Sequence, residues 1–164
     1  MQSEYFKLLP FAPNKGEVMI IECKDLTTQH IFKRSMVLAP LPTKDLFWFG
    51  SNYLWDFEDV LPSEKFYSQS KSLLEKWLKL PFKILEHKAS LRPATLERRP
   101  FVGFHPHFPS IGILNGMGAK GTSLAPYFAN ELVQHLVHGF PIKEEANVNR
   151  FRRILMASSN KKLE

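Results

Sequence analysis

The chain has 164 residues, of which 44% are hydrophobic and 13% aromatic, a composition typical of a globular protein rather than a disordered one. No apolar run approaches the roughly 20 residues that cross a membrane, and no charged-then-apolar leader opens the sequence, so we expect no membrane partner. The single Cys23 excludes a disulfide within the chain and any metal site built from several cysteines, which fits the reducing cytoplasm, so we expect a cytoplasmic protein. The net charge of +6 is spread along the sequence, which indicates a solvated surface but also leaves open a groove for phosphate groups or a docking face.

The first fifty residues predict three strands. Residues 17–23 contain a continuous apolar run, and residues 31–38 and 46–49 follow after short turns, which favours an antiparallel meander. Next, Tyr53, Trp55 and Phe57 alternate with polar residues. Aromatic side chains in this pattern either line a pocket or cover the edge of a sheet, and the sequence leaves both interpretations open.

Residues 63–80 predict a helix that Ser63 caps and Pro81 ends, with an inner stripe of Phe66, Ser70, Leu73, Leu74, Trp77 and Leu78. Residues 82–91 predict a fourth strand that leads directly to Arg92. The predicted fold class is therefore α+β, a mostly antiparallel sheet with flanking helices, in a single domain over residues 1–164.

The segment 89–139 contains the motifs that bear on function. A strand over residues 110–114 leads into a glycine turn, and a helix over about 126–137 follows. We expect one face of this helix to pack inward, through Ala125, Phe128, Ala129, Leu132, Val133 and Leu136. Gly139 is placed to cap its C-terminus, one more short helix is expected within 141–153, and the tail is expected to fray from about residue 154.

The glycine turn reads G-x-G-x-x-G from Gly116 to Gly121. A strand, a glycine turn and a helix N-terminus together form a seat for an electron-rich group. We reject a dinucleotide fingerprint, because no strand ending in an acidic residue follows the helix. A tight turn without any ligand remains the alternative.

Arg92 lies at the end of a predicted strand and beside Pro93, which restricts the backbone. Its guanidinium offers paired donors that match a carboxylate, so it is a candidate substrate clamp. The alternatives are a surface arginine and an arginine paired with a carboxylate such as Glu97. The pair His105 and His107 lacks a third ligand, so we expect no metal site, and no arrangement of side chains identifies a catalytic residue.

The segment resembles the C-terminal part of the D-amino-acid oxidase and glycine oxidase family of FAD-dependent oxidoreductases. The resemblance is carried by Arg92-Pro93, Thr95, Pro100 and Gly103, and then by Asn115-Gly116, Gly118, Gly121, Ala125 and Pro126. Upstream, residues 13–17 and 50–53 look like the family's substrate domain. Ser90 stands where the family usually has glycine, and Glu97 where it usually has aspartate.

The resemblance implies a bound FAD and an amine substrate, with an amino acid as the leading candidate. The substrate would pass a hydride to N5 of the flavin. The resemblance also implies that Arg92 and Tyr53 contact the substrate. The residues that it implies contact the flavin are Gly116, Met117, Gly118, Ala119, Lys120, Gly121 and Thr122. The family's N-terminal nucleotide-binding half is missing from this sequence, so we expect that half of the same parent protein to be a partner. Without it, we expect an exposed surface that self-associates, weak or absent FAD binding and no turnover.

Two other functions remain open. The turn followed by Ala125-Pro126 also resembles the oxidase half of bacterial tRNA wobble-uridine modification enzymes, and the basic charge is compatible with a nucleic-acid substrate. The third reading is an interaction module that keeps the fold without a cofactor.

Overall fold

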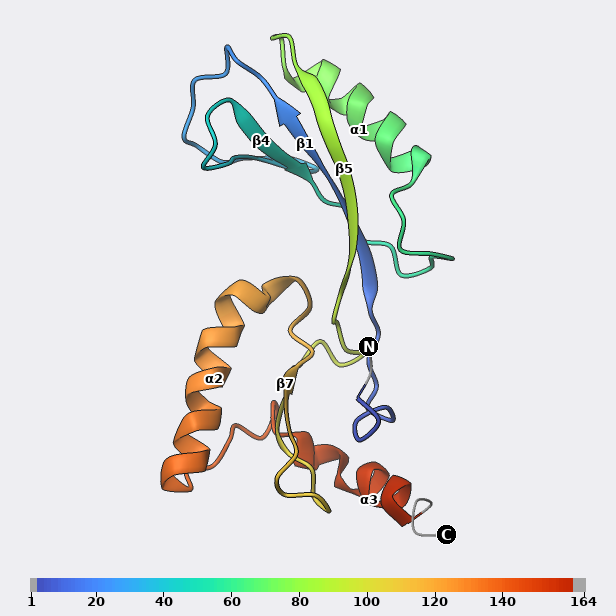
Figure 1. The fold of residues 1–164 in the computed structure, drawn as a ribbon, viewed down its shortest axis with the longest axis vertical. Coiled ribbons are helices and arrows are strands. Elements are labelled where there is room, and N and C mark those ends of the chain that lie inside the picture. The colour runs from blue at the N-terminus through green and yellow to red at the C-terminus, as the bar shows by residue number, and fades with distance from the viewer. Residues whose placement is uncertain (1–2, 161–164) are drawn as a thin grey trace. The chain divides into compact units, whose positions relative to one another are not determined.

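The computed structural model describes residues 3–160, which form two compact units. We call residues 14–91 the sheet unit, and residues 3–13 with 92–160 the hairpin unit (Figure 1). The boundary falls inside the segment 89–139, so the assignment of residues 1–164 to one domain stays a prediction. No helix within residues 3–160 combines the length and the apolar character needed to cross a membrane.

The sheet unit is built on five strands in the order β2-β3-β4-β1-β5. Their bounds are β1 Asn14–Glu22, β2 Phe32–Lys33, β3 Val37–Pro40, β4 Leu46–Gly50 and β5 Lys83–Arg92. The pairs β1–β4, β3–β4 and β2–β3 are antiparallel, so the predicted fold class is confirmed. The predicted meander is wrong in its order, because β4 lies between β3 and β1. Its Phe47 and Phe49 are buried, as suits a strand with neighbours on both sides.

The predicted strand over residues 31–38 is two short strands. The N–H of Arg34 donates to the Met36 carbonyl at 2.9 Å, and this turn separates β2 from β3.

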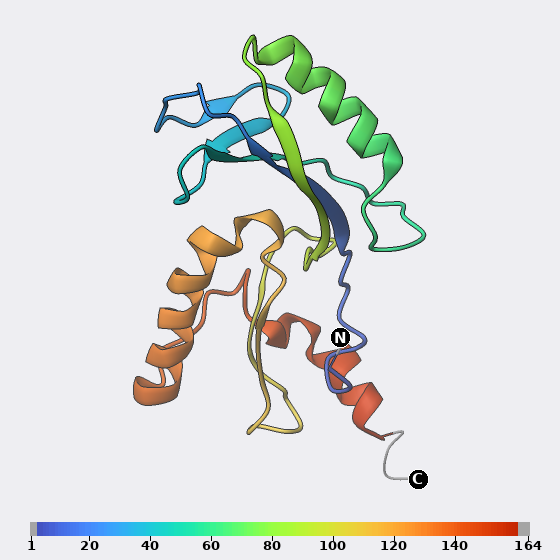
Figure 2. The same ribbon diagram turned by 45° about the horizontal axis from the view of Figure 1, so that its top comes forward.

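Helix α1 (Glu64–Trp77) runs alongside β5 in Figures 1 and 2 and covers the apolar side of the sheet. Phe66 and Leu74 from the helix pack with Met19, Ile21 and Phe49 from the strands. Alternate residues of β1 face this core, as the two-residue period of a strand requires. Ser63 caps the helix by accepting a hydrogen bond from the Phe66 N–H at 3.2 Å, so the predicted cap and inner stripe are confirmed.

The hairpin unit pairs β6 (Phe101–Phe104) with β7 (Gly112–Asn115) and continues into η1 (Gly118–Lys120) and α2 (Gly121–His138). Figure 2 shows α2 beside this hairpin. The sequence does not predict β6. No strand follows α2 as far as residue 160, in agreement with the rejection of a dinucleotide fingerprint. The unit ends with η2 (Val148–Phe151) and α3 (Arg152–Asn160).

Helix α2 begins at Gly121, five residues before the predicted start, and Gly139 caps it with a φ of 70°. Its inner face is narrower than the predicted stripe. Phe128 is buried, and Leu124 and Leu132 pack with it against β6 and the segment after the helix. The prediction is wrong for Val133 and Leu136, which are 52% and 61% exposed. The inner contacts recur every four residues, so they use one side of the helix only.

Helix α3 contradicts the expected fraying between residues 154 and 160. Leu155 is fully buried and packs with Phe6, Leu9, Phe101 and Val148. This contact with the N-terminal segment stabilises the helix, and sequence periodicity does not show it. Residues 161–164 of the predicted tail lie outside the described residues.

Candidate functional site

Arg92 is the last residue of β5, and the backbone after it turns sharply. The Arg92 carbonyl accepts a hydrogen bond from the Ala94 N–H at 2.8 Å, and the arginine itself is half-buried. The carbonyl of Pro93 accepts a hydrogen bond from the Gly118 N–H at 3.0 Å. The structure therefore brings the glycine turn against the residue that follows Arg92, within the hairpin unit.

Two glycines of the turn have a structural role. Gly116 has a φ of +83°, and a Cβ there would lie 2.6 Å from Cγ2 of Thr95. Gly118 has a φ of +54°, which also favours glycine, although a Cβ there would make only ordinary contact with Ala94. The side chain of Asn115 accepts from the Gly116 N–H at 2.7 Å and helps to close the turn.

Gly121 differs from the other two. It is the first residue of α2, its backbone angles are helical, and a Cβ there would meet nothing within 4 Å beyond the adjacent residues and the backbone of its own helix. Neither the backbone nor the packing of the described residues requires glycine at this position. Open space at a helix N-terminus is what close approach of a ligand needs.

The N-terminus of α2 has a positive electrostatic end that no acidic residue of its first turn offsets. Lys120 occupies the N-cap position and makes no side-chain capping bond, and the first turn contains no acidic residue. A helix N-terminus carries a partial charge of about +0.5. The residues present thus fit an electron-rich group such as the pyrimidine edge of a flavin, which Gly116 to Thr122 would hold.

Hydrogen bonds also stabilise the segment that follows Arg92, residues 95–100. Oγ1 of buried Thr95 donates to the Arg99 carbonyl at 2.8 Å and accepts from the Arg99 N–H at 3.1 Å. The Glu97 carboxylate accepts from Nε of Arg150 at 3.0 Å. Arg150 also donates to the Pro100 carbonyl and lies over the rings of Phe101 and Phe151. Glu97, at the position where the resembled family usually has aspartate, thus binds an arginine of its own unit.

Tyr53 belongs to the sheet unit and Arg92 to the hairpin unit. Tyr53 and Trp55 are 56% and 55% exposed. The interpretation that they cover the edge of the sheet is therefore not supported for these two side chains.

The fold forms a buried polar cluster around Glu17 that no sequence motif predicts. One carboxylate oxygen accepts from the Ser63 N–H at 2.6 Å and lies 3.0 Å from Nε2 of His87, and the other accepts from Oγ of Ser63 at 2.8 Å. Burial raises the pKa of the Glu17 carboxyl, but hydrogen bonds from Ser63 and Asn52, with the charge of Lys15, hold this pKa below its usual value. The only sequence signal was the resemblance of residues 13–17 to a substrate domain.

The two histidines of the H-x-H pair differ in environment. His105 is buried, and its Nδ1 accepts from the N–H groups of His107 and Phe108 at 3.2 and 3.3 Å. Burial, with a smaller contribution from His107, lowers the pKa of His105. Its neutral ring thus closes the loop between β6 and β7. The described residues contain no group of three potential metal ligands.

No protein-family model matches the sequence. Several solved structures share the fold. Iminodiacetate oxidase from Chelativorans sp. BNC1 matches with a TM-score of 0.69 and 17% identity, over 84% of this chain and 40% of that one. Glycine oxidase from Geobacillus kaustophilus matches with a TM-score of 0.66 and 18% identity, over 84% and 39%. L-proline dehydrogenase from P. horikoshii matches with a TM-score of 0.62 and 15% identity, over 91% and 41%.

The chain thus spans about two fifths of the length of these enzymes. At these identities the likeness establishes the fold, and glycine oxidases are among the matches, as the sequence resemblance implies. The chain has the fold of part of a group of oxidases and dehydrogenases that includes glycine oxidase.

Proposed function

We propose that this chain is the substrate-domain and flavin-contacting part of a longer, cytoplasmic FAD-dependent oxidoreductase that oxidises an amine, with amino acids as the first substrates to test. The observation that carries the proposal is the contact between the Arg92 segment and the glycine turn, through Pro93 and Gly118. This contact fixes a candidate carboxylate clamp relative to a helix N-terminus suited to an electron-rich group. The fold shared with amine- and amino-acid-oxidising enzymes supports it.

The residues of this chain then have separate tasks. The guanidinium of Arg92 binds the substrate carboxylate with paired, charge-assisted hydrogen bonds. The N-terminus of α2 stabilises negative charge on the group held at Gly116 to Thr122. When bound, FAD supplies the hydride acceptor. Tyr53, in the sheet unit, is the other substrate contact proposed from the sequence.

Replacing Arg92 with alanine in the complete enzyme is expected to raise the KM for an amino acid by about 10- to 100-fold, because a hydrogen bond to a charged group contributes about 1.5–3 kcal/mol. Arg92→Lys should recover only part of the loss, since an ammonium cannot bind a carboxylate through two parallel bonds. Steady-state kinetics with glycine and iminodiacetate measure the effect. Arg153→Ala, at an exposed position on α3, is the matched control. An unchanged KM in Arg92→Ala would exclude the clamp.

The isolated chain is expected to bind FAD only weakly, with a dissociation constant above micromolar. Within residues 3–160, only α2 follows a glycine turn, while the N-terminus of α1 is already capped by Ser63 and has Glu64 in its first turn. The FAD pyrophosphate therefore lacks the charge-assisted bonds of a second such site, each contributing about 1.5–3 kcal/mol. Titration of the purified chain against FAD, followed by flavin fluorescence, measures the affinity. Submicromolar binding would contradict the proposed division of the cofactor site.

We also propose that the isolated chain self-associates through the outer face of α2. Val133, Leu136 and Val137 are more than half exposed, and so is Phe140, which follows the Gly139 cap. Glu131 is the only Asp, Glu, Lys or Arg between residues 121 and 138, so few charges oppose contact with an apolar partner. Light scattering at high concentration should show dimers or larger species that Leu136→Lys dissociates. Ile31→Lys, at an exposed apolar position in the sheet unit, should leave the mass unchanged. A monomeric mass for the unsubstituted chain would contradict the proposal.

A further inference from the structure

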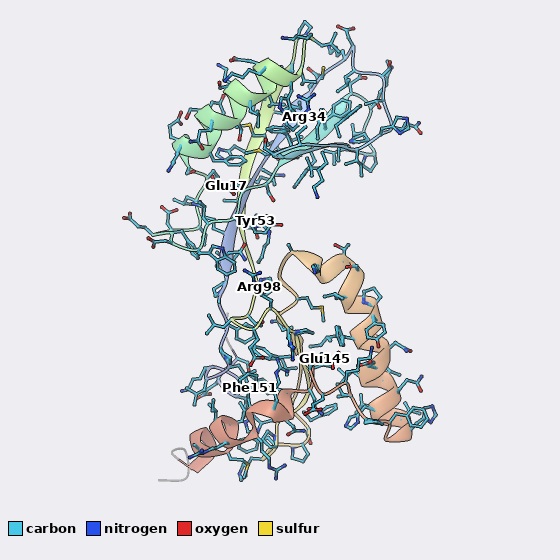
Figure 3. All side chains as sticks on the ribbon, turned by 180° about the vertical axis from the view of Figure 1, so that it is seen from behind. Glu17, Arg34, Tyr53, Arg98, Glu145 and Phe151 are labelled. Carbon is cyan, nitrogen blue, oxygen red and sulfur yellow. The ribbon has the colours of Figure 1, made fainter. Side chains whose placement is uncertain are left out.

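The loop between β4 and α1, residues 51–62, displays large aromatic side chains on the surface of the sheet unit. Tyr53 and Trp55 are 56% and 55% exposed, although Leu54 between them is half-buried. Packing of these two rings against the core therefore does not account for the shape of the loop. Figure 3 labels Tyr53 close to Glu17, which is a residue of β1.

The residues on both sides of Tyr53 are hydrogen-bonded to β1, Leu54 through its backbone and Asn52 through its side chain. After Tyr53, Leu54 and Lys15 exchange backbone bonds, with N–H to O distances of 2.9 and 2.8 Å. Before it, the N–H of Glu17 donates to Oδ1 of Asn52 at 2.7 Å, and Nδ2 of Asn52 donates to the Glu17 carboxylate at 3.3 Å. Tyr53 thus has a fixed backbone and an exposed ring.

The same carboxylate binds the far end of the loop. Ser63, which follows residue 62, donates both its N–H and its Oγ–H to Glu17. Nε2 of His87, on β5, lies 3.0 Å from the carboxylate, and the His87 ring stacks on Phe66. Because Glu17 is fully buried, its carboxylate has a fixed position between the two ends of the loop. Lys15 adds a contact with Asp59 at 3.4 Å.

We propose that Glu17 is a positioning residue, whose carboxylate holds both ends of the loop 51–62 so that Tyr53 is preformed for contact with the amine substrate. This inference rests on the proposed function. A ring on a fixed backbone loses little conformational entropy when a ligand binds, which is the reason binding residues lie on loops supported by a rigid scaffold.

Fluorine NMR of the chain labelled with 3-fluorotyrosine tests the positioning. Asn52→Ala removes the side chain that links Glu17 to the start of the loop and leaves Ser63 and His87 in place. The Tyr53 resonance, assigned with Tyr53→Phe, should move toward the shift of the free amino acid, and the Leu54 amide should exchange at least tenfold faster. The Tyr67 resonance should stay in place, because Tyr67 lies on α1 beside His87 and reports that the helix remains packed. An unchanged Tyr53 resonance would overturn the inference.

Two further variants separate positioning from general stability. Glu17→Gln keeps the size of the side chain but replaces one acceptor oxygen with an NH2 donor, which faces either the Ser63 N–H or the Asn52 amide, so it should change the Tyr53 resonance in the same direction. Glu86→Gln, on the exposed side of β5 where Glu86 pairs with Lys88, should change neither signal. If Asn52→Ala also displaces the Tyr67 resonance, helix α1 is disturbed and Glu17→Gln becomes the deciding variant. Unchanged Tyr67 and Tyr53 resonances in Glu17→Gln would then overturn the inference.

The complete enzyme supplies the functional readout. Asn52→Ala should raise the KM for glycine and iminodiacetate severalfold more than it lowers kcat. A displaced Tyr53 resonance with an unchanged KM would overturn the role in substrate binding. If Arg92→Ala leaves the KM unchanged while Asn52→Ala raises it, the proposed carboxylate clamp fails and the positioning role of Glu17 stands.

Discussion

Replacing Glu17 with alanine is expected to lower the free energy of unfolding of the sheet unit by about 3–5 kcal/mol, because several hydrogen-bond donors lose their acceptor and each costs about 1–3 kcal/mol. The substitution leaves the Ser63 N–H and Oγ and the Asn52 amide without their common acceptor, and it weakens the cap of α1. The three tryptophans, Trp48, Trp55 and Trp77, all lie in the sheet unit, so tryptophan fluorescence during urea unfolding reports on that unit. Glu86→Gln, with an exposed carboxylate, is the control. A loss below about 1 kcal/mol would mean that the cluster contributes little to stability.

The same carboxylate gives stability a pH dependence whose sign follows from its lowered pKa. The folded chain holds Glu17 ionised to a lower pH than the unfolded chain does, so the contribution is present above the ordinary glutamate value of 4.5. It is lost as the pH falls from that value through the lower pKa of the folded state. The free energy of unfolding should therefore decrease below about pH 4.5 less steeply in Glu17→Gln than in the parent chain. Equal slopes would show that other groups control the acid transition.

Replacing Gly116 with alanine is expected to destabilise the hairpin unit by about 2–4 kcal/mol, from the left-handed backbone and the overpacking together. The added methyl would lie 2.6 Å from Cγ2 of Thr95, whose side chain is already fixed by two bonds to the Arg99 backbone. The turn would move away from the Arg92 segment, and the hydrogen bond from Gly118 to Pro93 would weaken. Amide exchange of Gly118 measures this opening directly. Exchange as slow as in the parent chain would contradict the structural role of Gly116.

Gly121→Ala is the matched comparison, because the same methyl group has space at that position. Its stability should lie within about 1 kcal/mol of the parent, since alanine favours the helix over glycine. In the complete enzyme it should nevertheless weaken flavin binding, if the open space at the N-terminus of α2 receives the cofactor. Unchanged flavin affinity in Gly121→Ala would remove the argument for a ligand at this position.

Much of the local structure was accessible from the sequence, because local chemistry controls it. Ser63 before a helix, Gly139 after one and the apolar runs in β1 and β4 predict elements that the structure contains. The order of the strands was not accessible in this way. Turn lengths favour pairing of strands that are neighbours in the sequence, whereas in the structure β4 pairs with both β3 and β1, and its Phe47 and Phe49 point into the same core.

For the candidate site, the sequence by itself determined the residue types: a guanidinium beside proline, and a glycine turn before a helix. The tertiary structure decided which of these glycines the fold requires, because the reason lies in distant atoms, Thr95 for Gly116 and none within 4 Å for Gly121. It also decided the partner of Glu97, which is Arg150 from 53 positions away. Glu17 shows the same division most clearly. In the sequence it is one acid in a turn-and-strand motif. Only the folded sheet brings Asn52, Ser63 and His87 to its carboxylate. Hydrogen bonds between residues so far apart in the sequence depend on the packing of the chain and not on local spacing.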